Sequence, residues 1–345
     1  MSSIWTSNKG EWSEAYTFLR LLTNPIISAA DDYLEMKPGK YYVVKGLTLT
    51  TENQTFLVRP MEARYSFSES SSGVSNEEIS DSLPKILHEI SEGESAFSSP
   101  TTQRLFERMG LTKFKAASSQ KVDIELELPS LGGGQDAKLG FSIKSMLGSP
   151  STLFNASSTT NIRYSFSPED LDPSGLVDLK YHELRPYLKD KPITFEGFDL
   201  EIFKDNLEFF GIDFPQKLAA IVLSAHVGAG TRTLSEAITI WAADNGGQLA
   251  ADKFTFQMKN FLRATALGMR PGTPWKGDLE GYGGYIIVKP NGDLACLHLE
   301  NDDDFRSYLL NHTRLDFPKS SLFSASHVEK ERLYFSVNFQ IRFIK

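Results

Sequence analysis

Two segments near the middle of the chain alternate strictly between apolar and polar residues, over 122–128 and again over 139–145. A period of two is typical of a strand that buries one face and exposes the other. We therefore predict two strands, joined as a hairpin by the glycine-rich residues 129–138. Their polar face would carry Asp123, Glu125, Ser142 and Lys144.

Antiparallel pairing would gather these polar side chains into one patch. We expect a register that sets Asp123 opposite Lys144. The same register sets Glu125 opposite Ser142, because each step forward along one strand is a step back along its partner. Carboxylates beside an ammonium suit a metal-dependent phosphodiesterase, since acidic oxygens hold Mg²⁺ and the ammonium steers an attacking water and the developing phosphate charge. A structural hairpin with a solvated charged face is the alternative interpretation.

Apolar residues at helical spacing predict helices on both sides of this hairpin. The first helix begins near Lys9, where Asn8 and Glu11 have the spacing of a capping box. The other helices are predicted over residues 83–90, 102–109, 214–226, 234–243 and 252–267. Further strands are predicted over residues 41–49, 55–65, 161–166, 282–289 and 294–300. The Asn291-Gly292 pair would join the last two strands as a second hairpin.

The succession of helices and strands predicts a mixed α/β fold of the α+β kind. Residues 1–167 would form the core, with the opening helix, the hairpin and an insertion at 66–100 that begins with a serine-rich linker, 66–75. Two turn-rich segments, 169–175 and 186–192, mark a change from strand patterns to helical patterns. Residues 168–345 would then form a helical and β region that completes the core and contributes to recognition of its ligand.

The composition is ordinary for a soluble globular protein and argues against several other classes. No run of about 18 apolar residues is present to span a bilayer, and the opening residues lack the pattern of a secretory signal. The chain has a single cysteine, Cys296, and so can form no internal disulfide, which fits a cytoplasmic protein. The sequence contains neither a P-loop nor a nucleophile elbow, and its histidines lack zinc-site spacing.

A formal net charge of −8 argues, taken alone, against binding to nucleic acid. Binding depends on where the basic residues lie, however, and not on their sum. Acids concentrate in residues 69–94 and in a predicted acidic loop at 300–304, whereas basic residues alternate with aromatic residues or glycine at Arg163 and over 270–277. Each basic cluster could equally be a solvated surface.

Several motifs resemble one known family. The aspartate and lysine of the hairpin resemble the active site of the PD-(D/E)XK nuclease superfamily, and residues 140–157 resemble in particular the HpaII family of type II restriction endonucleases. Residues 8–18, 282–289 and 338–343 resemble that family as well, so the likeness extends over nearly the whole chain. The resemblance implies a restriction-endonuclease-like core, with a mixed central sheet flanked by helices and with helical and β-hairpin elaborations.

The resemblance also implies catalytic roles. Asp123 would be the principal metal ligand, and Lys144 would position water and stabilise charge. The superfamily usually has an acid two residues before the lysine, where this chain has Ser142. Glu125, on the same strand face as Asp123, and Glu14, on the opening helix, are the candidates for the missing acid. Glu14 could equally be a surface acid that the helix dipole favours.

A second acid-x-lysine frame exists at Asp136-Ala137-Lys138. It lies beside three glycines in the predicted turn, where a metal ligand would be poorly held. We therefore rank it below the frame that ends at Lys144.

The function implied is Mg²⁺-dependent cleavage of both strands of DNA at a short GC-rich palindrome, CCGG, in a restriction-modification system with a companion DNA methyltransferase. A homodimer would match the palindrome, and a monomer acting sequentially is the alternative. No membrane contact is expected. A DNA-binding or interaction module without catalysis is the second reading, favoured by Ser142 and by the acidic balance. The candidate DNA contacts are Arg163, Arg270 and Lys276 for guanine, and Asn155 and Ser157 for phosphate or for a turn or cap.

Overall fold

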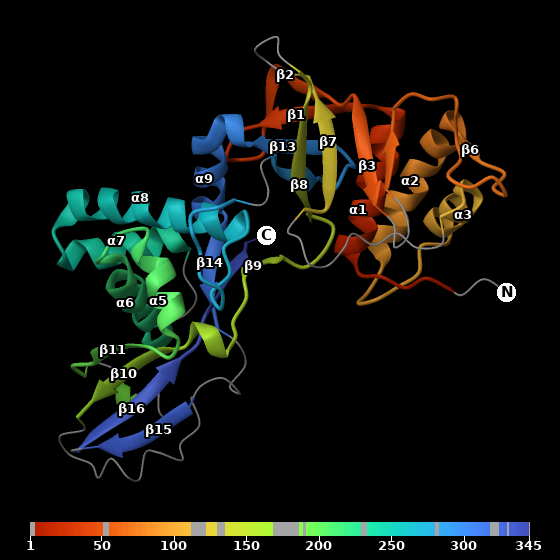
Figure 1. The fold of residues 1–345 in the computed structure, drawn as a ribbon. Coiled ribbons are helices and arrows are strands. Elements are labelled where there is room, and N and C mark those ends of the chain that lie inside the picture. The colour runs from red at the N-terminus through yellow and green to blue at the C-terminus, as the bar shows by residue number, and fades with distance from the viewer. Residues whose placement is uncertain are drawn as a thin grey trace. The chain divides into compact units, whose positions relative to one another are not determined.

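A computed structural model describes residues 4–50, 55–111, 122–129, 135–167, 186–188, 191–228, 233–279, 283–317, 324–329 and 331–344. The chain forms two compact units, each built from two stretches of sequence (Figure 1). Unit 1 contains Met1–Ser151 and Leu279–Phe305, and unit 2 contains Thr152–Asp278 and Arg306–Lys345. The predicted glycine turn at 130–134 and the turn-rich residues 169–175 lie outside the described ranges. None of the helices within these ranges is both long and apolar enough to cross a membrane.

An eight-stranded mixed sheet forms the centre of unit 1, in the order β2-β1-β13-β12-β8-β7-β3-β4 (Figure 1). Strand β1 runs parallel to β13 and β12 runs parallel to β8, while the other neighbours are antiparallel. The predicted mixed α/β fold is therefore confirmed. The strands are β1 (Ile26–Ala30), β2 (Met36–Val43), β3 (Gly46–Thr50), β4 (Thr55–Val58), β7 (Ile124–Leu128), β8 (Ala137–Ser145), β12 (Gly284–Val288) and β13 (Leu294–His298), with a separate pair β5 (Arg64–Tyr65) and β6 (Val74–Ser75).

Helices α1 (Lys9–Thr23), α2 (Asn76–Glu92) and α3 (Pro100–Met109) share one hydrophobic core with this sheet. The capping box predicted for Asn8 and Glu11 is present at the start of α1. From α1, Leu19 and Leu22 are buried in the same cluster as Phe141 of β8, so the helix covers the apolar face of the sheet. Burying these side chains contributes on the order of 2 kcal/mol each, and it holds the hairpin strands in place.

The N-terminus of α1 is also tied to the end of strand β8. The Lys9 ammonium donates to the carbonyl oxygens of Ser91 (2.6 Å) and Leu147 (3.0 Å). The Ser13 hydroxyl donates to Ser145 Oγ at 2.8 Å. These bonds fix the last residues of β8 against α1.

The sequence predicted many of these elements, but several expectations were wrong. Residues 41–49 do not form one strand, because β2 ends at Val43 and β3 begins at Gly46. Residues 55–65 do not form one strand, because β4 ends at Val58 and Pro60, which lacks an amide donor, follows it. Residues 66–75 are more than a linker, since β6 pairs with β5 and the Phe67 amide donates to the Met109 carbonyl. The acidic residues 300–304 are not a loop, because helix α9 (Asp302–Asn311) begins there with three aspartates in its first turn, where the helix dipole favours them.

The described residues of unit 2 form two smaller sheets and several helices. The sheets have the orders β11-β10-β16-β15 and β14-β17-β9. An aromatic cluster joins helices α6 and α8 to the turn after α5, with Phe210 against Phe214 and Phe261 at 5.7 Å each. The elements are β9 (Thr152–Phe154), a 3₁₀ turn (Ser158–Thr160), β10 (Ile162–Phe166), β11 (Thr194–Phe198), α5 (Glu201–Glu208), α6 (Phe214–Val227), α7 (Leu234–Asp244), α8 (Gly247–Ala266), β14 (Thr313–Asp316), β15 (Ser324–Glu329), β16 (Arg332–Val337) and β17 (Gln340–Phe343).

Candidate active site

Strands β7 and β8 form the predicted antiparallel hairpin in unit 1 (Figure 1). Ile124 and Leu126 are buried, whereas Glu125 between them is exposed. The predicted division into one apolar and one polar face is therefore confirmed. The apolar face packs on α1, which leaves the polar residues of β7 on the opposite face of the sheet.

The predicted register was wrong by two residues. Ile124 pairs with Phe141 and Glu125 pairs with Gly140, so Glu125 does not lie opposite Ser142. The paired ladder ends at Ile124, and Asp123 lies just before β7, where its amide bonds to the Phe141 carbonyl. A slip of two residues leaves every side chain on the same face, which is why the alternation could not detect it. On β8, Lys144 follows Ile143 of the buried core, so it lies on the face of the sheet away from α1.

Asp123 is held by the backbone of β8. Its amide donates to the Phe141 carbonyl at 2.9 Å, and its Oδ2 accepts a hydrogen bond from the Ile143 amide at 2.6 Å. The carboxylate is therefore oriented toward the strand that carries Lys144. A carboxylate has about four acceptor positions, so this bond leaves capacity for a cation.

Lys144 is oriented by the neighbouring strand β12. Its ammonium lies 5.1 Å from the centre of the Tyr285 ring, in a cation–π contact. Tyr285 is buried and packs edge-on against Phe305 of α9 at 5.1 Å. Strand β12 begins at Gly284 with φ +103°, where a Cβ would come within 2.2 Å of the Leu297 carbonyl oxygen, so only glycine fits this close approach.

Sequence reasoning did not single out Tyr285 as a functional residue. Cation–π contact depends on which strand lies beside β8, and the parallel pairing of β8 with β12 joins residues far apart in the sequence. The only signal was its place in the family-like segment 282–289. We infer that Tyr285 is a positioning residue for Lys144.

We expect Tyr285→Leu to lower the cleavage rate by about 10-fold, because a cation–π contact is worth about 1 to 2 kcal/mol when partly desolvated. Tyr285→Phe keeps the ring and is expected to retain most of the activity. Single-turnover rates of the two variants, at saturating enzyme, measure this difference. Equal losses in both variants would indicate that the hydroxyl, and not the ring, matters.

The two candidates for the second acid differ in their surroundings. Glu125 is exposed on β7, and its backbone neighbour on β3 is Thr48. Glu14 is half-buried on α1, directly after Ser13, which bonds Ser145. Within the described ranges, no three acidic, histidine or cysteine side chains form a group that could hold a metal ion. The structure therefore does not bring Asp123, Glu125 and Glu14 together as one three-carboxylate group.

In the second acid-x-lysine frame, the aspartate already forms an ion pair. Asp136 forms an ion pair with Lys45 at 2.8 Å. Lys138 is exposed and pairs in register with Glu127. An acid that is already neutralised by a lysine is a poorer cation ligand, which supports the frame that ends at Lys144.

All five candidate DNA contacts belong to unit 2. Arg163 is exposed on β10 but lies 3.6 Å from the Asp199 carboxylate, which lowers its net positive charge. Ser157 caps the 3₁₀ turn, because its hydroxyl accepts a hydrogen bond from the Thr159 amide, so the cap role left open by the sequence is present. The remaining candidates, Asn155, Arg270 and Lys276, are exposed.

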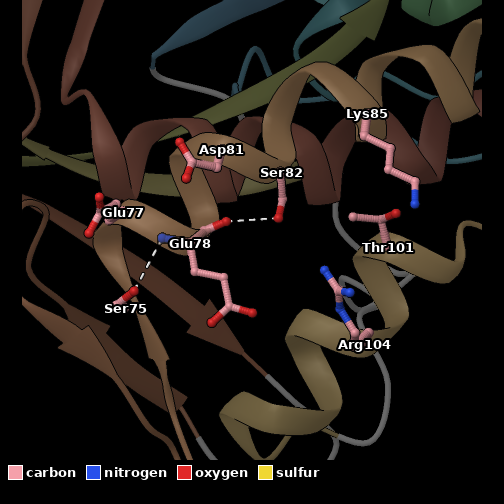
Figure 2. A pocket seen from close by; sticks show the side chains of 8 residues that line it. All are labelled: Ser75, Glu77, Glu78, Asp81, Ser82, Lys85, Thr101 and Arg104. Atoms are coloured by element: carbon pink, nitrogen blue, oxygen red, sulfur yellow. Dashed lines mark hydrogen bonds between the residues drawn. The ribbon is translucent and has the colours of Figure 1, made fainter.

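A hollow of about 400 Å³ lies between α2 and α3 in unit 1 (Figure 2). Lys85, Thr101 and Arg104 lie on one side of it, with Glu77 and Asp81 on the other (Figure 2). None of the candidate site residues lines this hollow. It is therefore separate from the hairpin site.

His298, at the end of β13, is buried beside the hairpin. Its ring stacks on Tyr42 at 4.8 Å and contacts Phe141 at 5.9 Å. Nδ1 accepts a hydrogen bond from the Glu300 amide at 3.0 Å, which favours the neutral ring. Burial lowers the pKa of His298 from 6.5 to about 4. The Glu300 carboxylate, 3.8 Å from Nδ1, would raise this pKa, but it is 44% exposed and water screens it.

Because the pKa of His298 is lowered in the folded chain, we expect the free energy of unfolding to decrease in acid. The unfolded chain takes up the proton at about pH 6.5 and the folded chain only near pH 4, so stability is complete above pH 6.5 and falls as the pH decreases toward 4. Between about pH 7.5 and about pH 5, we expect the free energy of unfolding to fall by about 2 kcal/mol on this account. Urea unfolding at both pH values measures the change. His298→Asn should remove most of it, and an unchanged pH dependence in this variant would contradict the prediction.

Comparison with known proteins gives a consistent result. The model of the HpaII restriction endonuclease family matches residues 8–343. The type II restriction enzyme HpaII of Haemophilus parainfluenzae is 28% identical over 366 aligned residues, which cover 100% of both chains. No solved structure matches the chain. The matched range includes the hairpin, Tyr285 and all the candidate DNA contacts.

Proposed function

The chain belongs to the HpaII restriction endonuclease family, and on that premise we propose that it is an active, Mg²⁺-dependent type II endonuclease that cuts double-stranded DNA. The observation that carries this proposal is the hairpin, where the Asp123 carboxylate accepts a hydrogen bond from the amide of Ile143, the residue before Lys144 on β8. This hairpin resembles that of a PD-(D/E)XK nuclease, in which an acid and a lysine act on the same phosphate.

The residues of this face suit Mg²⁺. Magnesium takes oxygen ligands, keeps several waters and is usually bound through one or two carboxylates together with substrate phosphates. Asp123 and Glu125, two residues apart at the start of β7, would supply two carboxylates, and Glu14 is the further candidate. When bound, Mg²⁺ would neutralise the charge that develops on the phosphate and would help to form the nucleophile. Two carboxylates meet this requirement without a third.

The chain's own groups would act around the scissile phosphate. The Asp123 carboxylate, fixed by the Ile143 amide, would orient the cation and accept a hydrogen bond from the attacking water. The Lys144 ammonium would donate to that water and to a phosphate oxygen as its negative charge increases. Attack in line with the leaving oxygen breaks the bond to the 3′ oxygen and leaves a 5′-phosphate.

A catalytically inactive DNA-binding module on the same scaffold is the second candidate. It is favoured by Ser142, which stands where the superfamily has an acid, and by the lack of a three-acid group in the described ranges. Plasmid cleavage with and without Mg²⁺ separates the two. We expect the wild-type protein to linearise plasmid DNA only with Mg²⁺, whereas DNA binding without any cleavage would favour the module.

The finer proposal is that the target is CCGG and that the enzyme works in a restriction-modification system with a DNA methyltransferase. Support comes from similarity to a named restriction enzyme and from exposed arginine and lysine side chains in unit 2, which suit guanine O6 and N7. A homodimer would place two hairpins on the two strands of a palindrome.

Methylation at cytosine C5 within the site is expected to slow cleavage by about 10- to 100-fold, because the methyl group lies in the major groove and displaces contacts worth about 1 to 3 kcal/mol. Parallel digests of methylated and unmethylated duplexes of one sequence measure this effect. Equal rates would count against reading from the major groove.

A further inference from the structure

A buried asparagine holds the loop that carries Arg270 and Lys276. Asn206, at the end of α5, is 1% exposed. Its amide nitrogen donates to the carbonyl oxygens of Arg270 (3.1 Å) and Thr273 (2.9 Å), and its Oδ1 accepts from the Trp275 amide (2.8 Å). One side chain therefore makes three hydrogen bonds to the backbone of this loop.

An aromatic contact fixes the same loop at Trp275. The indole stacks on Phe210 at 5.4 Å and an interplanar angle of 22°, and it contacts Phe209 at 5.4 Å. Its Nε1 donates to the Asp278 carbonyl at 2.7 Å. Lys276, the next residue after this anchor, is exposed. The loop is therefore ordered in its backbone and presents its cations outward.

A second buried asparagine holds the turn that precedes Arg163. Asn338, 4% exposed, donates from its amide to the Ser157 carbonyl and to Asn161 Oδ1 (2.6 Å). Its own Oδ1 accepts from the Thr160 hydroxyl at 3.3 Å. Residues 157–161 are thus fixed in the same manner as the first loop.

The two loops lie against each other in unit 2. A Cβ built on Gly272 would lie 3.3 Å from Thr159 Cγ2, so the backbone of the first loop packs directly on the second. We propose that residues 157–161 and 270–276 form one rigid two-loop platform that reads the bases of double-stranded DNA. Asn206 and Asn338 are then its positioning residues. This inference rests on the proposed function.

The rigid backbone of these two loops favours a role in reading bases of duplex DNA over a role in contacting phosphates alone. A bidentate contact of arginine with guanine needs the side chain within a fraction of an ångström, whereas a phosphate contact tolerates motion. Loops ordered before binding also lose less conformational entropy when DNA binds. Removing the supports should therefore weaken discrimination between sequences more than it weakens binding itself.

The decisive substitution is Asn206→Asp, which keeps the acceptor for the Trp275 amide and replaces the donor with an oxygen facing two carbonyl oxygens. The ratio of affinities for a CCGG duplex and a scrambled duplex, measured without Mg²⁺, is expected to fall about 10- to 100-fold. Affinity for the scrambled duplex should change by less than about 3-fold, because phosphate contacts remain. Hydrogen exchange at the Trp275 amide should become faster.

The matched control is Asn76→Asp in unit 1, where the asparagine amide donates to the Leu22 carbonyl at 3.3 Å. This control makes the same chemical change and should leave the ratio unchanged. If the wild-type protein discriminates and Asn206→Asp keeps the full ratio, the platform is overturned and the proposed function stands. If the wild-type protein binds both duplexes equally, the proposed sequence specificity fails, and the platform fails with it.

A second test does not depend on a buried position. Gly272 is exposed, and Gly272→Ala would press its Cβ on the Thr159 methyl group. The affinity ratio is expected to fall about 3- to 10-fold. Adding Thr159→Ser removes that methyl group, keeps the hydroxyl bonded to Ser157 and should restore the ratio. Failure of this rescue would show that contact between the loops does not govern recognition.

Discussion

Asp123→Asn is expected to lower the rate of DNA cleavage by at least about 100-fold, in line with loss of a group that stabilises charge in the transition state. Asparagine can still accept the hydrogen bond from the Ile143 amide, so the hairpin should keep its structure. What is lost is one negative charge at the proposed cation site. Single-turnover cleavage over a series of Mg²⁺ concentrations measures both the rate and the apparent metal affinity.

The matched control for Asp123 is Asp136→Asn, which tests the second acid-x-lysine frame. Asp136 pairs with Lys45 on the surface, and removing a surface ion pair costs at most about 1 kcal/mol. We expect this variant to cleave within about 3-fold of the wild type. The reverse result, with Asp136 essential and Asp123 dispensable, would move the active site to the other frame.

Lys144→Met should lower cleavage by at least about 100-fold as well, because methionine removes the ammonium that steers water and phosphate charge. Methionine retains an unbranched stem against the Tyr285 ring, so packing is largely preserved. Binding of a CCGG duplex, measured without Mg²⁺, should change much less than the cleavage rate. A large loss of cleavage rate with little loss of DNA affinity would show that Lys144 acts in catalysis and not in DNA binding.

Lys138→Met is the control on the same strand, since Lys138 is exposed and lies six residues earlier on the same face. It is expected to retain nearly full activity. Cleavage by Lys144→Met at the wild-type rate would exclude this lysine from catalysis, whatever Lys138→Met does.

The alternation of apolar and polar residues predicted the two faces of the hairpin correctly, but it could not predict which residues pair across the hairpin. Alternation states which side chains share a face, and a shift of two residues preserves every face, so only the structure places Glu125 opposite Gly140. Likewise, the capping box at Asn8 predicted the start of α1, because the signal is local. The sheet order could not be predicted, because β12 joins β8 from a position more than a hundred residues later.

Part of the candidate site was predictable as well, because part of it depends on residues close together in the sequence. Asp123 directly precedes β7 and Lys144 lies on β8 of the same hairpin, so a local pattern was enough to place them in one hairpin. Tyr285 and Asn206 act on residues brought together only by folding, and neither has a spacing that marks it. The division expected at residue 167, the metal-binding acids and the base-reading residues remain predictions.

The most direct test of the account is the sequence at the ends of the fragments that the wild-type protein produces from a plasmid of known sequence with Mg²⁺, with Asp123→Asn in parallel. The account predicts discrete fragments that end within CCGG and carry 5′-phosphates, and no fragments from the variant. Random ends, or fragments that persist in the Asp123→Asn digest, would contradict it.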